Sequence, residues 1–176
     1  MSSVTAPTNQ EQPFKVNVEV LFHEHHHFVF RTAYGITGTA VDAEDVVQTV
    51  FLRLLGNGIS PDMEQNPKAY LYRAAVNRAL DILQSQKRQR TFGPVACTTD
   101  ADHTQQAETI HRKLYEAIGT LGAKAAEILI LRYVHDASDA EIAKLLGTSR
   151  GAIAVNLYRS RARLKKILRA SLEEER

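Results

Sequence analysis

Apolar residues along this chain of 176 residues recur at intervals of three and four, and no stretch keeps the strict alternation of a half-buried strand. The first such segment runs from about Val16 to Ile36 and ends before Gly38, a frequent type of helix stop. Its apolar stripe consists of Val18, Phe22, Val29, Ala33 and Ile36. The pattern predicts an all-α fold that begins with a long helix.

A second helix is predicted from Asp42, with Glu44 and Asp45 in its first turn, where carboxylates suit the positive end of the helix dipole. The sequence Gly56-Asn57-Gly58 ends this helix, and a loop leads on to Asn66. The buried face is expected to hold Val46, Val47, Val50, Phe51, Leu54 and Leu55.

The pair Asn66-Pro67 predicts the start of a third helix, because a cap residue is followed by proline in the first turn. This helix extends from Lys68 to about Gln89. Its charge is one-sided, since only Asp81 opposes Lys68, Arg73, Arg78, Lys87, Arg88 and Arg90. Tyr70 and Tyr72 add rings of the kind that stack on exposed bases, although each ring taken singly is better explained as a core residue.

The composition changes between Thr91 and Gln106, where Gly93-Pro94, threonines and aspartates replace the periodic apolar positions. We interpret this stretch as a flexible linker between two small helical domains. The predicted divisions are a disordered leader over 1–14, a domain over 15–90, the linker over 91–107, a second domain over 108–172 and a tail over 173–176.

The second domain contains a helix-turn-helix pattern. After helices predicted from Glu108 to Gly119 and from Ala123 to Val134, Ser138 and Glu141 form a capping box. Gly147 is the turn, and Ser149 caps a last helix that carries no acid before Glu173. Such a helix fits the major groove of DNA, with its N-terminal residues at the base edges and its arginines on phosphates.

Composition excludes several classes of protein. The single cysteine, Cys97, permits neither an internal disulfide nor a cysteine zinc site. No apolar run approaches the ~20 residues of a membrane span, and the polar N-terminus lacks the features of a signal peptide. We expect a cytoplasmic protein. No nucleotide-binding glycine loop, HExxH or nucleophile motif is present, so we expect no catalytic residue, no cofactor and no small-molecule substrate.

The stretch "LFHEHHHFVF" holds four histidines, His23, His25, His26 and His27. On a helical wheel His25 and His26 flank the apolar stripe, while His23 and His27 lie together on the polar side. At most two of the four share a face, short of the number that a stable metal site needs. We therefore expect a helix surface and no metal site, and a pH- or metal-sensing role stays open.

Three stretches of the sequence carry a family resemblance: "DAEDVVQTVFLRLL", "PKAYLYRAAVNRALDIL" and "SDAEIAKLLGTSRGAIAVNLYRSRARL". In this order and spacing they resemble the extracytoplasmic-function (ECF) group of alternative sigma factors of bacterial RNA polymerase. The resemblance covers roughly Val18 to Leu168. It implies a promoter-specificity subunit with two partners, core polymerase and promoter DNA, that itself catalyses nothing.

The resemblance also implies roles for particular residues. The helix from Asp42 would dock on polymerase through Asp45, Gln48 and Arg53. The helix after Asn66 would recognise and melt the −10 element through Tyr70, Arg73, Asn77, Arg78, Lys87 and Arg88. The last helix would read the −35 element through Ser149, Arg150, Asn156, Tyr158, Arg159 and Arg161.

Some positions depart from the family pattern. Ala154, Val155 and Asn156 replace the usual basic and small polar residues of the reading helix, and they cannot make the bidentate guanine contacts that dominate direct readout. We expect an altered −35 preference or a larger share of phosphate contacts. Thr49 replaces a common glutamate in the polymerase-docking helix, and Tyr70 replaces a common tryptophan.

An alternative interpretation is a helix-turn-helix regulator that binds duplex DNA as a dimer without polymerase. It leaves the "DAEDVVQ" and "YLYRAAVN" helices unexplained. Many members of the ECF group are held inactive by an anti-sigma partner, and the sequence leaves open whether this chain is.

Overall fold

The computed structural model describes residues 17–58, 60–92 and 113–173, and within these ranges all regular structure is helical. The helices are α1 (Val18–Thr37), α2 (Ala40–Asn57), α3 (Pro61–Gln65), α4 (Pro67–Phe92), a segment over 113–120, α6 (Ala123–Tyr133), α7 (Asp139–Leu146) and α8 (Arg150–Glu173). The prediction of an all-α fold with two helical domains is confirmed. None of these helices is long and apolar enough to cross a membrane.

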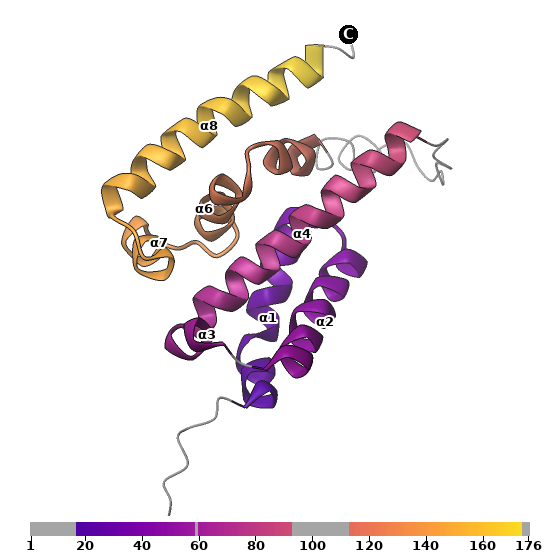
Figure 1. Cartoon of the computed structure of the whole chain (residues 1–176). Helices are drawn as coiled ribbons and strands as arrows, with labels where there is room; N and C mark the ends of the chain where they lie inside the picture. Colours follow the sequence, from indigo (N-terminus) through magenta and orange to yellow (C-terminus); the bar gives the residue numbers. More distant parts are fainter. Residues whose placement is uncertain (1–16, 59, 93–112, 174–176) are drawn as a thin grey trace, which may run out of the picture.

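In the N-terminal domain α1, α2 and α4 pack against one another, and the short α3 packs on α4 (Figure 1). Side-chain caps explain where the helices begin. Thr39 Oγ1 accepts a hydrogen bond from the Asp42 amide at the start of α2, and Asn66 Oδ1 accepts one from the Ala69 amide at the start of α4. The predicted start of α4 at Asn66-Pro67 is therefore confirmed.

Two residues assigned to buried stripes are exposed. Leu55 is 67% exposed, whereas its neighbour Leu54 is 4% exposed, because adjacent helical residues point about 100° apart and only one of them faces α1 and α4. In α1, Leu21 takes the buried position and Phe22 is 39% exposed. The helix α3 lies where a loop was predicted, and its Met63 is fully buried.

In the C-terminal domain α6, α7 and α8 contact one another, and α7 and α8 form the predicted helix-turn-helix. The Ser138–Glu141 capping box at the start of α7 is present in both directions. Gly147 occupies the turn with φ 67°, a left-handed conformation that favours glycine. Ser149 Oγ accepts a hydrogen bond from the Ala152 amide, so Ser149 caps α8 as predicted.

The two domains pack against each other through α1 and α4 on one side and α6 and α7 on the other. Figure 1 shows α6 between α8 and α4. Buried apolar residues of both domains form one continuous cluster. Helix α4 continues to Phe92, two residues past the expected end of the domain. The leader over 1–14 and residues 93–107 of the predicted linker lie outside the described residues.

Candidate functional surfaces

Helix α2 presents an exposed face on the side away from the bundle. Its members follow one another at spacings of four and three: Val41, Asp45, Gln48, Leu52 and Leu55. On this α2 face the side chain of Val41 is 78% exposed, that of Leu52 65% and that of Leu55 67%. Exposed apolar groups clustered in this way are typical of protein–protein interfaces.

The three predicted polymerase contacts do not all lie on the α2 face. Asp45 and Gln48 belong to it and are exposed. The carboxylate of Asp45 accepts a hydrogen bond from Arg78 Nη2 of α4 at 2.9 Å. Arg53 instead lines the cleft described next. The Asp45–Arg78 ion pair therefore joins a predicted polymerase contact in α2 to a predicted −10 contact in α4.

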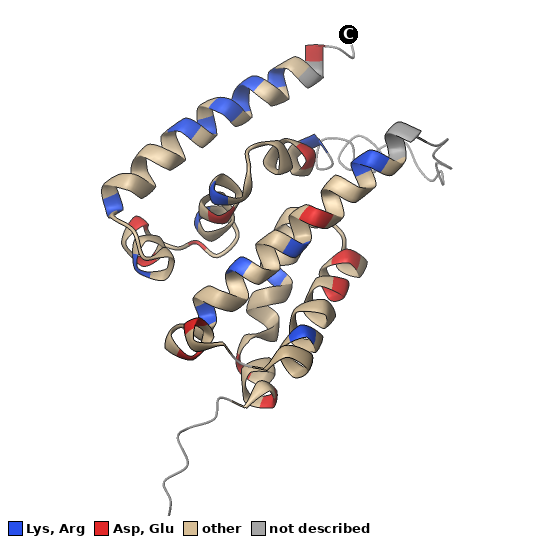
Figure 2. Cartoon of the chain, in the orientation of Figure 1, with Lys and Arg blue, Asp and Glu red and all other residues tan. Residues whose placement is uncertain are grey.

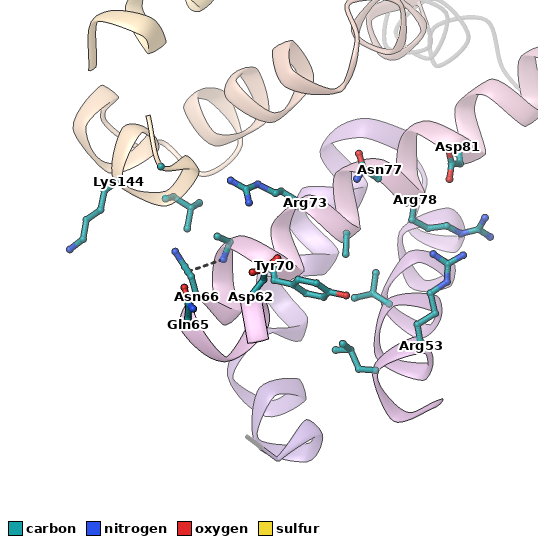
Figure 3. A pocket seen from close by; sticks show the side chains of 16 residues that line it. Arg53, Asp62, Gln65, Asn66, Tyr70, Arg73, Asn77, Arg78, Asp81 and Lys144 are labelled. Atoms are coloured by element: carbon teal, nitrogen blue, oxygen red, sulfur yellow. Dashed lines mark hydrogen bonds between the residues drawn. The ribbon is translucent and has the colours of Figure 1, made fainter. Parts of the chain in front are cut away.

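A cleft of about 720 Å³ lies along the N-terminal half of α4 (Figure 3). Four predicted −10 residues line this α4 cleft: Tyr70, Arg73, Asn77 and Arg78. Helix α2 contributes Arg53, and α3 with the start of α4 contributes Asp62, Gln65 and Asn66. The C-terminal domain forms part of the wall with Lys144, Leu145 and Gly147. The structure thus collects an aromatic ring, guanidinium groups and amides in one groove.

The two tyrosines of α4 have different surroundings. Tyr70 is half-buried and lines the α4 cleft. Tyr72 is fully buried, and its hydroxyl donates to the backbone carbonyl of Glu127 in α6. Burial raises the pKa of Tyr72 well above its usual value. Tyr72 is therefore a core residue, and only Tyr70 is placed to stack on a base.

The remaining predicted −10 residues differ in their positions. Arg73 is exposed, and its Nη2 donates to the carbonyl of Leu146 at the end of α7, at 3.1 Å. Asn77 is exposed within the cleft. Lys87 and Arg88 are exposed further along α4 and do not line the cleft.

Helix α8 carries basic residues along its length, and Glu173 at its end is the one acid in its described part (Figure 2). Ser149 and Arg150 stand exposed at its start, and Tyr158, 77% exposed, and Arg159 follow two turns later. Asn156 is half-buried, and its Nδ2 donates to the Ala152 carbonyl of its own helix at 2.8 Å. This hydrogen bond uses one of the side-chain donors with which Asn156 could contact a base.

Arg161 is held by a residue that sequence patterns did not reveal. Its Nε donates to the hydroxyl of Tyr133 in α6 at 2.6 Å. The guanidinium also lies 5.6 Å from the centroid of the same ring, within the range of a cation–π contact. The two residues are 28 positions apart in different helices, so no local motif links them.

The histidines of α1 occupy the positions expected from the helical wheel. His23 and His27 are exposed, and His25 and His26 are half-buried. The His26 ring stacks on Phe22 with centroids 4.9 Å apart, and its Nδ1 lies 2.8 Å from the Phe22 carbonyl oxygen. Within the described ranges, no three His, Cys, Asp or Glu residues gather in a way that could hold a metal ion.

Comparison with known proteins places these surfaces in a family. Residues 21–89 match the sequence model of Sigma-70 region 2, and residues 111–164 match that of Sigma-70 region 4. The RNA polymerase sigma-E factor of Streptomyces antibioticus is 30% identical over 143 residues, which cover 80% of this chain and 78% of that protein. The ECF RNA polymerase sigma factor SigL of Mycobacterium tuberculosis is 30% identical over 150 residues, which cover 80% and 82%.

Among solved structures, that of CnrH in complex with the cytosolic domain of CnrY matches with a TM-score of 0.52 and 22% identity. The match covers 87% of this chain and 88% of that one, and it supports the fold.

The region 2 match accounts for α1, α2 and α4, the helices that a regulator built only on a helix-turn-helix would leave unexplained. The function of a sigma subunit, with core RNA polymerase and promoter DNA as partners, follows from the two matched regions together. The chain belongs to the extracytoplasmic-function group of RNA polymerase sigma factors.

Proposed function

We propose that three surfaces divide the work of this sigma subunit. The α2 face docks on core polymerase, the α4 cleft takes the unpaired −10 strand, and the N-terminal half of α8 reads the −35 element. The α4 cleft is the strongest support for this proposal, because it brings Tyr70, Arg73 and Asn77 together beside α2, the helix with the docking surface.

Docking through the α2 face is supported by its mixture of exposed groups. Leu52 and Leu55 offer apolar area, and Asp45 and Gln48 offer polar atoms between Val41 and Leu52. An apolar centre with polar groups beside it is the usual anatomy of a specific protein interface.

The α4 cleft suits a base that has left the double helix. Its volume of about 720 Å³ lies in the range of small-molecule pockets, so an unstacked base fits. Tyr70 offers a ring for stacking, and the Asn77 amide offers both a donor and an acceptor for a base edge. Arg53 and Arg73 supply positive charge for the phosphates. Contacts made only by a flipped base would offset the cost of unstacking it.

We propose that α8 recognises DNA mainly through contacts with phosphates and through apolar contacts with bases. Ala154 and Val155 are exposed in its second turn, where methyl groups can contact the methyl group of thymine. Arg150, Arg159 and Arg161 supply charge for the backbone, with Ser149, Asn156 and Tyr158 beside them. Lys87 and Arg88 of α4 would contact phosphates near the −10 element.

The proposal gives the chain no catalysis of its own, since polymerase performs the chemistry. Its place of action is the bacterial cytoplasm, where its polymerase partner acts.

Reconstituted transcription tests the proposal. Core polymerase with the purified chain should start RNA synthesis at defined sites on fragmented genomic DNA, and core polymerase alone should not. Absence of any specific start site with the chain present would contradict it.

A further inference from the structure

Tyr133, the last residue of α6, lies beside the proposed −35 helix, although no local motif in the sequence links it to DNA binding. Its side chain is 61% exposed, and α6 packs against α8. The Tyr133 hydroxyl accepts a hydrogen bond from Arg161 Nε at 2.6 Å, and the Arg161 guanidinium lies 5.6 Å from the centroid of the Tyr133 ring. Two exposed side chains from different helices are thus joined at the surface of the C-terminal domain.

The hydrogens of this pair determine what it can still bind. An arginine side chain has N–H donors and no acceptor, so Arg161 keeps the donors on its two Nη atoms after Nε has bonded to Tyr133. A tyrosine hydroxyl can accept a hydrogen bond and still donate its own hydrogen. In the described part of the chain the Tyr133 hydroxyl has no second partner. The pair therefore offers donors only, and it fits a group that is purely an acceptor.

The charge around the pair is positive. Lys165 follows Arg161 one turn along α8, and both line one hollow between α6 and α8 together with Tyr133. Glu173 is the one acid that lines this hollow in the described part of the chain, and it lies more than three turns beyond Arg161. An anion with several oxygen acceptors matches both the donors and the charge, and a DNA phosphate is such a group.

The position of Arg161 along α8 favours a phosphate over a base edge. Arg161 shares a face of the helix with Ala154 and Tyr158, since the three residues follow one another at spacings of four and three. At 1.5 Å per residue, Arg161 lies about 17 Å beyond Arg150 along the helix axis, whereas the major groove is about 12 Å wide. A helix whose first turns contact base edges therefore brings Arg161 to the sugar-phosphate backbone at the edge of the groove.

The pairing also positions the arginine before DNA arrives. A free arginine side chain loses much rotamer freedom when it binds a phosphate. Arg161 is already held by the hydroxyl and the ring of Tyr133, so less freedom remains to be lost and the phosphate is bound more tightly. Substitutions at exposed positions usually change the stability of a fold little. DNA binding therefore explains this exposed pair better than stabilisation of the fold does.

We propose that Tyr133 and Arg161 form one phosphate site, in which the Arg161 Nη atoms and the Tyr133 hydroxyl donate to the same phosphate of the promoter duplex at the edge of the −35 element. Tyr133 is then a positioning residue for Arg161 and also a DNA contact from a helix outside the helix-turn-helix. This inference rests on the proposed role of α8 and adds a residue to it.

Tyr133→Phe tests this phosphate site, because it removes the hydroxyl and keeps the ring. Core polymerase with the full-length chain is titrated with a labelled duplex from a promoter recovered in the transcription assay. We expect Tyr133→Phe to bind about fivefold more weakly than wild type, as for the loss of one hydrogen bond. Its salt dependence should not change, because tyrosine carries no charge, whereas Arg161→Ala should reduce the salt dependence by about one phosphate.

Tyr34→Phe is the matched control. It removes a tyrosine hydroxyl at an exposed position of α1, in the other domain, and should bind the duplex as wild type does.

Ethylation interference identifies the group that the pair binds. With wild type, ethylation of one phosphate at the edge of the −35 element should weaken binding. This effect should be smaller in Tyr133→Phe and absent in Arg161→Ala, at the same phosphate. Wild-type affinity in Tyr133→Phe would overturn the inference. So would weaker binding with the wild-type interference pattern, which would make Tyr133 a structural residue.

Arg159→Ala separates this failure from failure of the proposed function. If Arg159→Ala weakens binding to the upstream element and Tyr133→Phe does not, only the Tyr133–Arg161 phosphate site is refuted. If neither variant changes the affinity, or if no promoter is recovered, the proposed role of α8 fails and the phosphate site fails with it.

Discussion

Asn77 and Arg73 face the same cleft, but only Arg73 has a bond to the other domain. Asn77 therefore gives the simpler test of the cleft. We predict that Asn77→Ala lowers the yield of open promoter complex about fivefold, which corresponds to the loss of about 1 kcal/mol of hydrogen bonding, and leaves polymerase affinity unchanged.

Permanganate reactivity of unpaired thymines measures this yield. Asn57→Ala, at an exposed position at the end of α2 outside the cleft, is the matched control. Equal loss of opening and of polymerase binding in Asn77→Ala would show that Asn77 is a structural residue.

His135 gives the domain interface a dependence on pH. Burial, followed by the nearby charges of Arg31 and Lys68, lowers the pKa of His135 to about 4 from its usual 6.5. Glu141 and Asp136 line the same hollow as His135 and Lys68. In the unfolded chain the ring is in water and has an ordinary pKa, so the unfolded chain binds more protons between pH 4 and 6.5.

The folded chain therefore has the full benefit of the neutral His135 ring above about pH 6.5 and loses stability as the pH falls toward 4. We predict that the free energy of unfolding, measured by urea titration, falls as the pH is lowered from 7 to 5. His135→Gln should flatten this dependence, and His23→Gln, at an exposed site on the same interface-forming helix α1, should not. A wild-type free energy of unfolding that does not change more over this range than that of His135→Gln would contradict the prediction.

At the scale of elements, α2 and α8 carry surfaces of opposite character. The α2 face presents apolar groups. We predict that Leu52→Asp lowers affinity for core polymerase about tenfold or more, as expected when a buried interface residue is lost. Native-gel or anisotropy titration with core polymerase measures this affinity. Val20→Asp in α1, also at an exposed apolar position (49%), should have little effect; an equal effect would assign the docking surface elsewhere.

Helix α8 presents charge. Arg159→Ala should weaken binding to the upstream element and reduce the salt dependence by about one phosphate, with little change in base preference. Titration of the polymerase complex with duplex upstream DNA at several salt concentrations measures both quantities. Arg169→Ala, near the far end of the helix, serves as the comparison. A large change in base preference for Arg159→Ala would show that this arginine reads bases.

Helix starts that are set by capping residues could be predicted from the sequence. The capping box at Ser138 and the start of α4 at Asn66-Pro67 depend on residues within one helical turn. Helix α3 was missed although Ser60-Pro61 has the same pattern of a cap residue followed by proline, because five residues are too few to display a period of 3.6. The prediction that Leu55 is buried was wrong. An apolar residue at the edge of a helical stripe can belong to the core or to a protein-docking surface, and both roles require the same type of side chain.

At the scale of the whole molecule, the contacts between domains have no sequence signature. Arg73 and Leu146 are 73 positions apart, and Thr32 and His135 are 103 apart. No periodic pattern links such pairs, so the sequence predicted the basic and aromatic residues of the α4 cleft but not its wall from α7. Similarly, Arg161 pairs with Tyr133 because the fold places α6 beside α8, and no sequence pattern links the two residues.

In the proposed function, one chain carries a docking surface, a −10 cleft and a −35 reader for the same promoter. The most direct measurement is a footprint of core polymerase with this chain on a promoter recovered from the genomic transcription assay. We expect unpaired bases about ten positions upstream of the start site and a protected duplex segment centred near position −35, both lost without the chain. A specific start site with neither signal, or the same footprint from core polymerase alone, would contradict it.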